Sequence, residues 1–229
     1  YKDRPYDGEI AYVDSSLAKL FGFLREKKLM DGTIIILTGD HGESLGEHGE
    51  TTHGYFAYSA TLRVPLIFSI PGFRSGRSKQ EVCHADIFRT VCDVINLPVP
   101  KFVEGLSLLT VVKGGRLPER PIYFESLYPY YSRGWAPLRG IISKGKKYID
   151  SPIPEFYDLE IDSAETRNLA ESTDLRPYKE DLGRLMASGR SGSMFSDKRK
   201  LDAEAREKLA SLGYLSSPSG ASKKTFTTK

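Results

Sequence analysis

The residues best suited to chemistry lie in one short segment, residues 38–54, whose sequence is TGDHGESLGEHGETTHG. It holds three of the chain's four histidines, and its adjacent residues Asp40 and His41 combine a carboxylate with an imidazole. An oxygen and a nitrogen ligand side by side are a suitable pair for a divalent metal ion. The spacing therefore predicts a metal site. The alternative is a capped turn, with Asp40 as an N-cap and His41 as a surface histidine.

This segment follows a stretch with the composition of a buried strand. Residues 33–38, TIIILT, are β-branched or apolar throughout, which predicts a strand covered on both faces, as in a parallel sheet flanked by helices. In open α/β sheets, ligands bind beyond the carboxyl ends of the strands. Gly39 and Gly42 bracket the Asp–His pair and allow a sharp turn. We therefore expect both side chains to point at one site just past the strand.

The rest of the chain predicts an α/β layer followed by a smaller α+β subdomain. Residues 5–29 and 85–96 have the three-and-four spacing of amphipathic helices, and residues 64–70 read as a second buried strand. After residue 115 the pattern changes to short strands between Gly and Pro turns, as in an antiparallel sheet. The expected strands are 122–125, 138–143, 147–150 and 156–159, with a helix at 175–187.

We therefore divide the chain into an α/β part (1–115), an α+β subdomain (116–187) and a flexible basic tail (188–229) with a short helix near 202–212. Residues 186–229 hold nine Lys and Arg against four Asp and Glu, which is a net charge of +5. This exceeds the net charge of +3 of the whole chain. The folded part thus has no basic surplus, and we expect no nucleic-acid partner. The longest apolar runs reach about seven residues, so no membrane span is expected.

Several motifs, taken in order, resemble the second half of a sulfatase of the alkaline-phosphatase superfamily. The upstream ones are YDGEIAYVDS at 6–15, TGDHGESLGEHG at 38–49 and LRVPLIF at 62–68. The downstream ones, which resemble strands of that family's C-terminal subdomain, are KKYI at 146–149, EFYDL at 155–159 and NLA at 168–170. The resemblance implies an alkaline-phosphatase-like mixed sheet flanked by helices, plus a small subdomain with an antiparallel sheet.

The resemblance implies roles for three residues. Asp40 and His41 match the positions at which the family binds a divalent cation, usually calcium. Their chemistry alone favours zinc or manganese, because calcium prefers oxygen ligands, and those metals would suit a phosphatase-like relative. His53 stands where sulfatases commonly place a lysine that holds the sulfate or protonates the leaving oxygen. We expect His53 to replace it as cation or general acid. The alternatives are a metal ligand, as in phosphatase-like relatives, or a supporting histidine.

The family's nucleophile, a Cys or Ser in a Cys/Ser-x-Pro-x-Arg motif that sulfatases convert to formylglycine, has no match here. Neither Cys83 nor Cys92 fits it. The resemblance therefore implies a fragment of a sulfuric ester hydrolase that acts on sulfate esters together with a missing N-terminal half. Alone, the chain should be inactive and bind metal weakly. The resemblance also favours a bacterial protein located outside the cytoplasm as the source of this fragment.

Two alternatives remain. One is a phosphatase or a phosphonate or phosphodiester hydrolase of the same superfamily. The other is a non-catalytic fragment that binds a partner or self-associates through an exposed sheet edge. Among the remaining candidates, we expect His48 to be structural and Glu43, Glu47 and Glu50 to cap the loop. His84 should be a buried partner of backbone groups.

Overall fold

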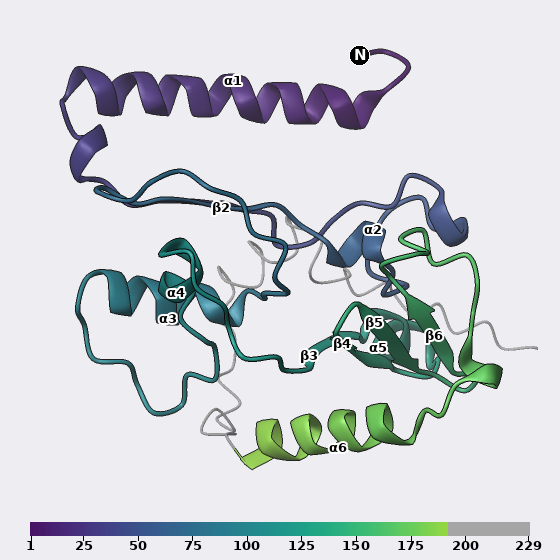
Figure 1. The fold of residues 1–229 in the computed structure, drawn as a ribbon. Helices are drawn as coiled ribbons and strands as arrows, with labels where there is room; N and C mark the ends of the chain where they lie inside the picture. The colour runs from purple at the N-terminus through teal and green to yellow at the C-terminus, as the bar shows by residue number, and fades with distance from the viewer. Residues whose placement is uncertain (192–229) are drawn as a thin grey trace, which may run out of the picture. The chain divides into compact units, whose positions relative to one another are not determined.

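The computed structural model of the chain describes residues 1–191, and residues 1–188 form one compact unit (Figure 1). The helix expected near 202–212 and most of the expected basic tail lie outside the described residues. The main elements, in chain order, are α1 (Pro5–Glu26), β1 (Ile35–Thr38), α2 (Ser59–Leu62), β2 (Leu66–Ser69), α3 (Ala85–Val94), α4 (Leu109–Val112), β3 (Ile122–Ser126), α5 (Tyr128–Arg133), β4 (Leu138–Ser143), β5 (Lys146–Asp150), β6 (Glu155–Asp158) and α6 (Arg176–Ser191). Short 3₁₀ turns lie at Met30–Gly32, Glu47–Gly49 and Ala170–Ser172.

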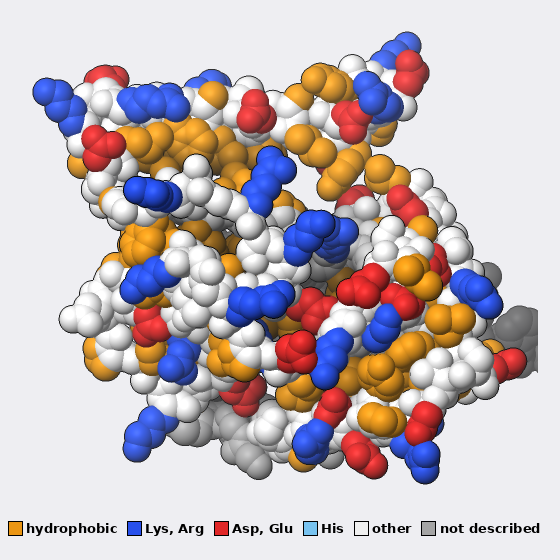
Figure 2. All heavy atoms as spheres, viewed as in Figure 1, with side chains coloured by type: hydrophobic (Ala, Val, Ile, Leu, Met, Phe, Trp, Pro, Cys, Tyr) orange, Lys and Arg blue, Asp and Glu red, His pale blue; other side chains and the backbone are white. Residues whose placement is uncertain are grey.

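The first helix, α1, forms where the apolar spacing predicts it, with Pro5 in its first turn. None of its residues is buried, and Ile10, Val13 and Phe23 are each more than half exposed. Figure 2 shows hydrophobic side chains lying open along this helix. The described part of the chain therefore leaves much of the apolar face of α1 uncovered. Among the same residues, no helix combines the length and apolar content needed to cross a bilayer.

The first sheet contains β1 and β2, which pair antiparallel with Ile35 opposite Ser69 and Thr38 opposite Leu66. The expectation of a parallel neighbour for residues 33–38 is therefore wrong for this pair. An unbroken apolar run reports that both faces of a strand are suited to burial, but it carries no signal for the direction of the neighbouring strand. Cover on both faces is also incomplete, because no residue of β1 is fully buried within this chain.

The second sheet is antiparallel, as the downstream spacing predicts, and its strands lie in the order β3-β4-β5-β6 of a meander. Successive residues of β5 point to opposite faces. Tyr148 packs in a cluster with Leu182 of α6, whereas Ile149 packs in a cluster with Ala57, which precedes α2. One face of this sheet is thus covered by α6 and the other by the segment that leads out of residues 38–54. The division near residue 116 stays a prediction.

Four tyrosines of this sheet region donate hydrogen bonds from their hydroxyls to carboxylates. The pairs are Tyr58 and Tyr157 with Glu155, Tyr123 with Glu125, and Tyr148 with Asp150. Burial and then the adjacent carboxylate raise the pKa of each phenol, that of Tyr123 to about 12. These phenols therefore stay protonated in the folded chain at pH values where an unfolded tyrosine ionises.

We expect the free energy of unfolding to fall as the pH rises through the window from about 10 to 12. In that window the unfolded state loses tyrosine protons that the folded state retains, so stability declines with pH. Urea unfolding at about pH 9 and about pH 11 measures the effect. The Tyr123→Phe variant should show a shallower decline, and an unchanged slope in that variant would contradict this explanation.

Candidate functional site

The Asp40–His41 pair lies directly after β1, in a turn without a following helix. The backbone N–H of His41 donates to Asp40 Oδ1 at 3.0 Å, and His41 Nε2 lies 3.8 Å from Asp40 Oδ2. This N–H, followed by the charges of His41 and His53, lowers the pKa of Asp40. The Asp40 side chain is 76% exposed. The turn thus holds an ionised carboxylate in the open, beside an imidazole, and does not use it to cap a helix.

The rings of His41 and His53 lie against each other, with centroids 4.0 Å apart and planes inclined by 33°. His53 Nδ1 donates to Glu43 Oε2 at 2.9 Å. The structure therefore brings together the three residues singled out by the sequence, Asp40, His41 and His53. Glu43, expected only as a loop cap, is also part of this group. Its contact with His53 could not be predicted from the sequence, because the two residues are ten positions apart in an irregular loop.

The loop approaches α2 closely at Gly42, whose N–H donates to Thr61 O at 2.7 Å. A Cβ on Gly42 would lie 2.1 Å from the carbonyl oxygen of Ala60. A real Cβ does not approach a backbone atom so closely, so only glycine fits here without moving one of the two segments. Gly42 thus allows close backbone packing as well as the turn.

Gly42→Ala should lower the free energy of unfolding by about 1–3 kcal/mol, the usual cost of forcing an atom into an occupied space. Gly32→Ala is the matched control. A Cβ there meets nothing within 4 Å, so its effect should stay within about 0.5 kcal/mol. Urea denaturation of the two variants measures the difference, and equal midpoints would contradict the packing argument.

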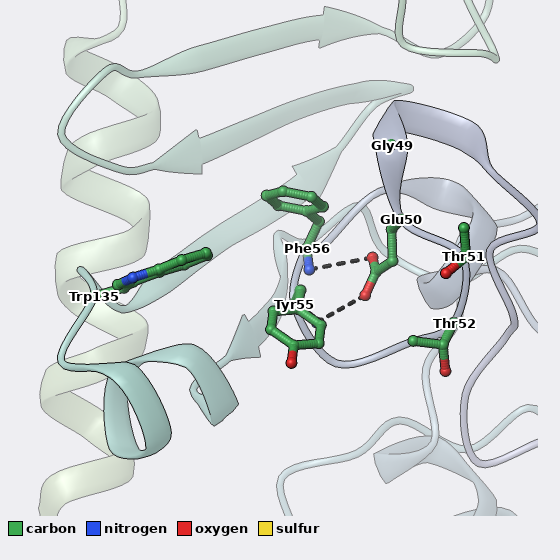
Figure 3. A pocket seen from close by; sticks show the side chains of 7 residues that line it. All are labelled: Gly49, Glu50, Thr51, Thr52, Tyr55, Phe56 and Trp135. Atoms are coloured by element: carbon green, nitrogen blue, oxygen red, sulfur yellow. Dashed lines mark hydrogen bonds between the residues drawn. The ribbon is translucent and has the colours of Figure 1, made fainter.

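The part of the loop that carries His53 is closed by a buried carboxylate. Glu50 is 5% exposed and accepts the N–H groups of Tyr55 at 2.8 Å and Phe56 at 3.3 Å (Figure 3). These two bonds tie the residues on either side of His53 to each other. Glu50 is therefore the loop cap that the sequence suggested. Glu47 has the same role, because its carboxylate accepts the N–H of Leu45 at 2.6 Å.

The remaining two histidines hold the segment against other parts of the chain. His84 Nε2 donates to Gly39 O at 2.8 Å, so it bonds a backbone group as expected, although it is exposed and not buried. His48 stacks on Tyr58 with centroids 3.6 Å apart and donates from Nε2 to Ala164 O at 3.0 Å. Both contacts of His48 are structural, as expected, and the bond to Ala164 joins the loop to the chain beyond β6.

A buried ion pair that the sequence did not reveal fixes the segment that follows the loop. Lys147 Nζ lies 2.5 Å from Glu165 Oε1, and both side chains are inaccessible to solvent to within 1%. The other oxygen of Glu165 accepts the N–H of Ser59 at 2.6 Å. Lys147 also lies 5.3 Å from the ring centroid of Phe124. The first turn of α2 is thus anchored to the second sheet.

A sequence model of the family described as Sulfatase matches residues 2–97, a range that runs from α1 through the whole site to the end of α3. This chain belongs to the sulfatase family. Its curated sulfatase relatives include the choline-sulfatase of Rhizobium meliloti, which is 30% identical over 174 residues. That match covers 74% of this chain and 33% of the relative, so the chain spans about a third of the length of the relative.

Solved structures match the fold over most of this sulfatase chain. One, a protein in complex with its substrate D-glucosamine-2-N,6-O-disulfate, has a TM-score of 0.61 at 25% identity and covers 83% of this chain and 41% of its own. The phosphonate monoester hydrolase of Agrobacterium radiobacter has a TM-score of 0.63 at 24% identity, with 80% and 40% covered. The latter likeness shows the fold alone. The chain is therefore a mixed α/β structure that matches the alkaline-phosphatase-superfamily sulfatases.

The sulfatase family implies a divalent metal, and the donors in this chain fit part of a coordination shell. His41 Nδ1 donates to Gly42 O at 3.0 Å, which fixes the tautomer and leaves Nε2 free to bind a metal, a usual arrangement for metal-binding histidines. Asp40 supplies an exposed oxygen on the same side. Over residues 1–191, however, no group of three or more His, Cys, Asp or Glu side chains is placed to hold a metal. Calcium takes six to eight ligands, so this pair alone cannot complete its shell.

Proposed function

We propose that this chain is the C-terminal portion of a metal-dependent sulfuric ester hydrolase, which cleaves sulfate esters. The observation that carries the proposal is the contact between the His41 and His53 rings beside Asp40, at the end of β1 and within the range matched by the family. The choline-sulfatase relative and the solved complex with a disulfated glucosamine support sulfate esters as the substrate class.

Each residue of the site has a distinct proposed role. Asp40 and His41 Nε2 would hold the metal, which we take to be Ca²⁺ and which would screen the charge of the sulfate oxygens when bound. His53 would contact the sulfate or protonate the departing oxygen. Glu43 accepts the Nδ1 proton of His53, so Nε2 is the nitrogen left for the substrate.

The nucleophile of this proposal lies outside the chain, in the N-terminal part of the longer protein. Within residues 1–191, Cys92 is buried in α3, and the Cys83 Sγ lies 3.7 Å from a nitrogen of Arg120, far along the chain from the site loop. Over these residues, no hydrogen bond joins either cysteine to His53. We therefore expect the isolated chain to show no turnover and no sub-micromolar calcium binding by calorimetry.

The alternative within the superfamily is cleavage of phosphate or phosphonate esters, with Zn²⁺ or Mn²⁺ at the same residues. Charge separates the two: a phosphate monoester carries a second negative charge and needs more positive compensation than a sulfate ester. Assaying the full-length protein with nitrophenyl sulfate and nitrophenyl phosphate decides between them. We expect the larger kcat/KM for the sulfate, and a large preference for the phosphate would overturn the proposal.

A second, non-catalytic candidate is self-association through the first sheet. Within the described residues, β1 and β2 form a sheet of only two strands, so both of its outer edges lack a strand partner. Unpaired edges favour pairing with another chain, and the open apolar face of α1 adds to this tendency. Light scattering on the purified chain tests the candidate. Dimers or larger species support it, and a stable monomer contradicts it.

A further inference from the structure

A shallow pocket of about 260 Å³ lies beside the loop that carries His53. Figure 3 shows Trp135 on one side, Thr51 and Thr52 on the other, and the rings of Tyr55 and Phe56 between them. Its walls therefore combine aromatic faces with hydroxyl groups. The loop supplies most of the walls, and the segment after α5 supplies Trp135.

The aromatic side chains are held in place although they face solvent. The ring of Tyr55 packs against that of Tyr128 in a T-shaped arrangement, with centroids 5.4 Å apart, and its centroid lies 6.4 Å from that of Trp135. The N–H of Tyr55 donates to Glu50 at 2.8 Å, and Ser126 Oγ donates to the carbonyl oxygen of the residue before Tyr55 at 2.7 Å. Trp135 remains 54% exposed. Hydrogen bonds thus hold the backbone that presents these aromatic side chains, which no described residue covers fully.

The polar wall is equally open to a ligand. Over residues 1–191 the structure contains no hydrogen bond to the side-chain hydroxyl of Thr51 or Thr52, and both residues are exposed. Glu50 differs, because both of its carboxylate oxygens are already bound by backbone N–H groups. The pocket therefore offers neutral hydroxyls, and its one carboxylate is engaged in closing the loop.

We propose that this pocket binds one pyranose ring of a sugar, which is the alcohol part of the sulfate ester in the proposed function, on which this inference rests. The negative face of an aromatic ring attracts the weakly positive C–H face of a sugar, and the threonine hydroxyls pair with sugar hydroxyls. The volume is below the roughly 300–1,000 Å³ of sites for drug-sized ligands, which suits a single ring. A quaternary ammonium is the competing occupant of an aromatic pocket. It would find no unengaged carboxylate here.

Trp135 is the only tryptophan of the chain and lines the pocket, so its fluorescence reports binding there. Titration of the chain with unsulfated N-acetylglucosamine should give a saturable change in tryptophan emission, with a Kd of the order of 1 mM for so small a contact. The double variant Thr51→Val, Thr52→Val should raise this Kd about tenfold, the loss of roughly one good hydrogen bond. Tyr131→Ala is the control, since Tyr131 is 78% exposed and does not line the pocket.

Three results would overturn the inference: no saturable response to the sugar, an unchanged Kd in the double variant, or tighter binding of choline than of the sugar. The probe carries no sulfate and the readout needs no turnover. Failure of sulfate-ester hydrolysis in the assay above therefore bears on the proposed function, whereas failure of this titration bears on the sugar site alone.

Discussion

Replacing Lys147 with alanine should lower the free energy of unfolding by about 3–5 kcal/mol, the cost of leaving one partner of a buried ion pair unpaired. The Glu165 carboxylate would then be buried with only the N–H of Ser59 to bind it. Burial lowers the pKa of Lys147, and the charge of Glu165 opposes that shift. The pair therefore persists because each charge compensates the other. Urea unfolding of the variant measures the loss.

The neighbouring residue provides a matched control. Lys146 pairs with Asp158 near the surface, where both side chains retain some solvent contact, so Lys146→Ala should cost about 1 kcal/mol or less. Removing both charges of the buried pair, in Lys147→Met with Glu165→Gln, should recover most of the stability lost in Lys147→Ala. Equal costs for the two single lysine variants would contradict the role assigned to the buried pair.

In the full-length protein, Asp40→Ala should lower kcat/KM for a sulfate ester by about 10³-fold, which corresponds to roughly 4 kcal/mol of transition-state stabilisation. The carboxylate is a proposed metal ligand, and its loss removes both a donor atom and a negative charge from the site. Its side chain is 76% exposed, so the free energy of unfolding should change little. Steady-state kinetics together with urea unfolding separate the two effects.

Asp31→Ala is the control for this variant, because Asp31 is an exposed aspartate before β1, whereas Asp40 follows that strand. We expect Asp31→Ala to keep kcat/KM within about threefold, a difference of less than 1 kcal/mol. If Asp40→Ala retained activity to within tenfold, the proposed metal role of Asp40 would be wrong.

The sequence predicted those features that depend on local chemistry. The apolar run at 33–38 and the glycines after it predict a strand and a turn, and the structure places Asp40 and His41 just past β1. Short strands between Gly and Pro turns after residue 115 predict an antiparallel sheet, which is confirmed. The pairing direction of β1 was predicted wrongly, because apolar composition reports burial and contains no information on which strand lies alongside.

The features that were missed depend on contacts between distant residues. In the sequence, Lys147 stands beside Lys146 and reads as one of two surface lysines on a strand. Only the packing of residues 57–59 against the second sheet makes it a buried partner of Glu165. The contact between Glu43 and His53 depends in the same way on how Glu50 closes the loop.

The central claim, that Asp40 and His41 hold a cation with His53 beside them, can be tested most directly by NMR of the four histidines during a Mn²⁺ titration of the chain. A paramagnetic ion broadens nearby signals even when it binds weakly. We predict that the His41 and His53 ring signals broaden together and well before that of His48, whose ring stacks on Tyr58. Asp40→Asn should shift both responses to higher Mn²⁺ concentration. Broadening of His48 first, or separate responses of His41 and His53, would contradict this arrangement.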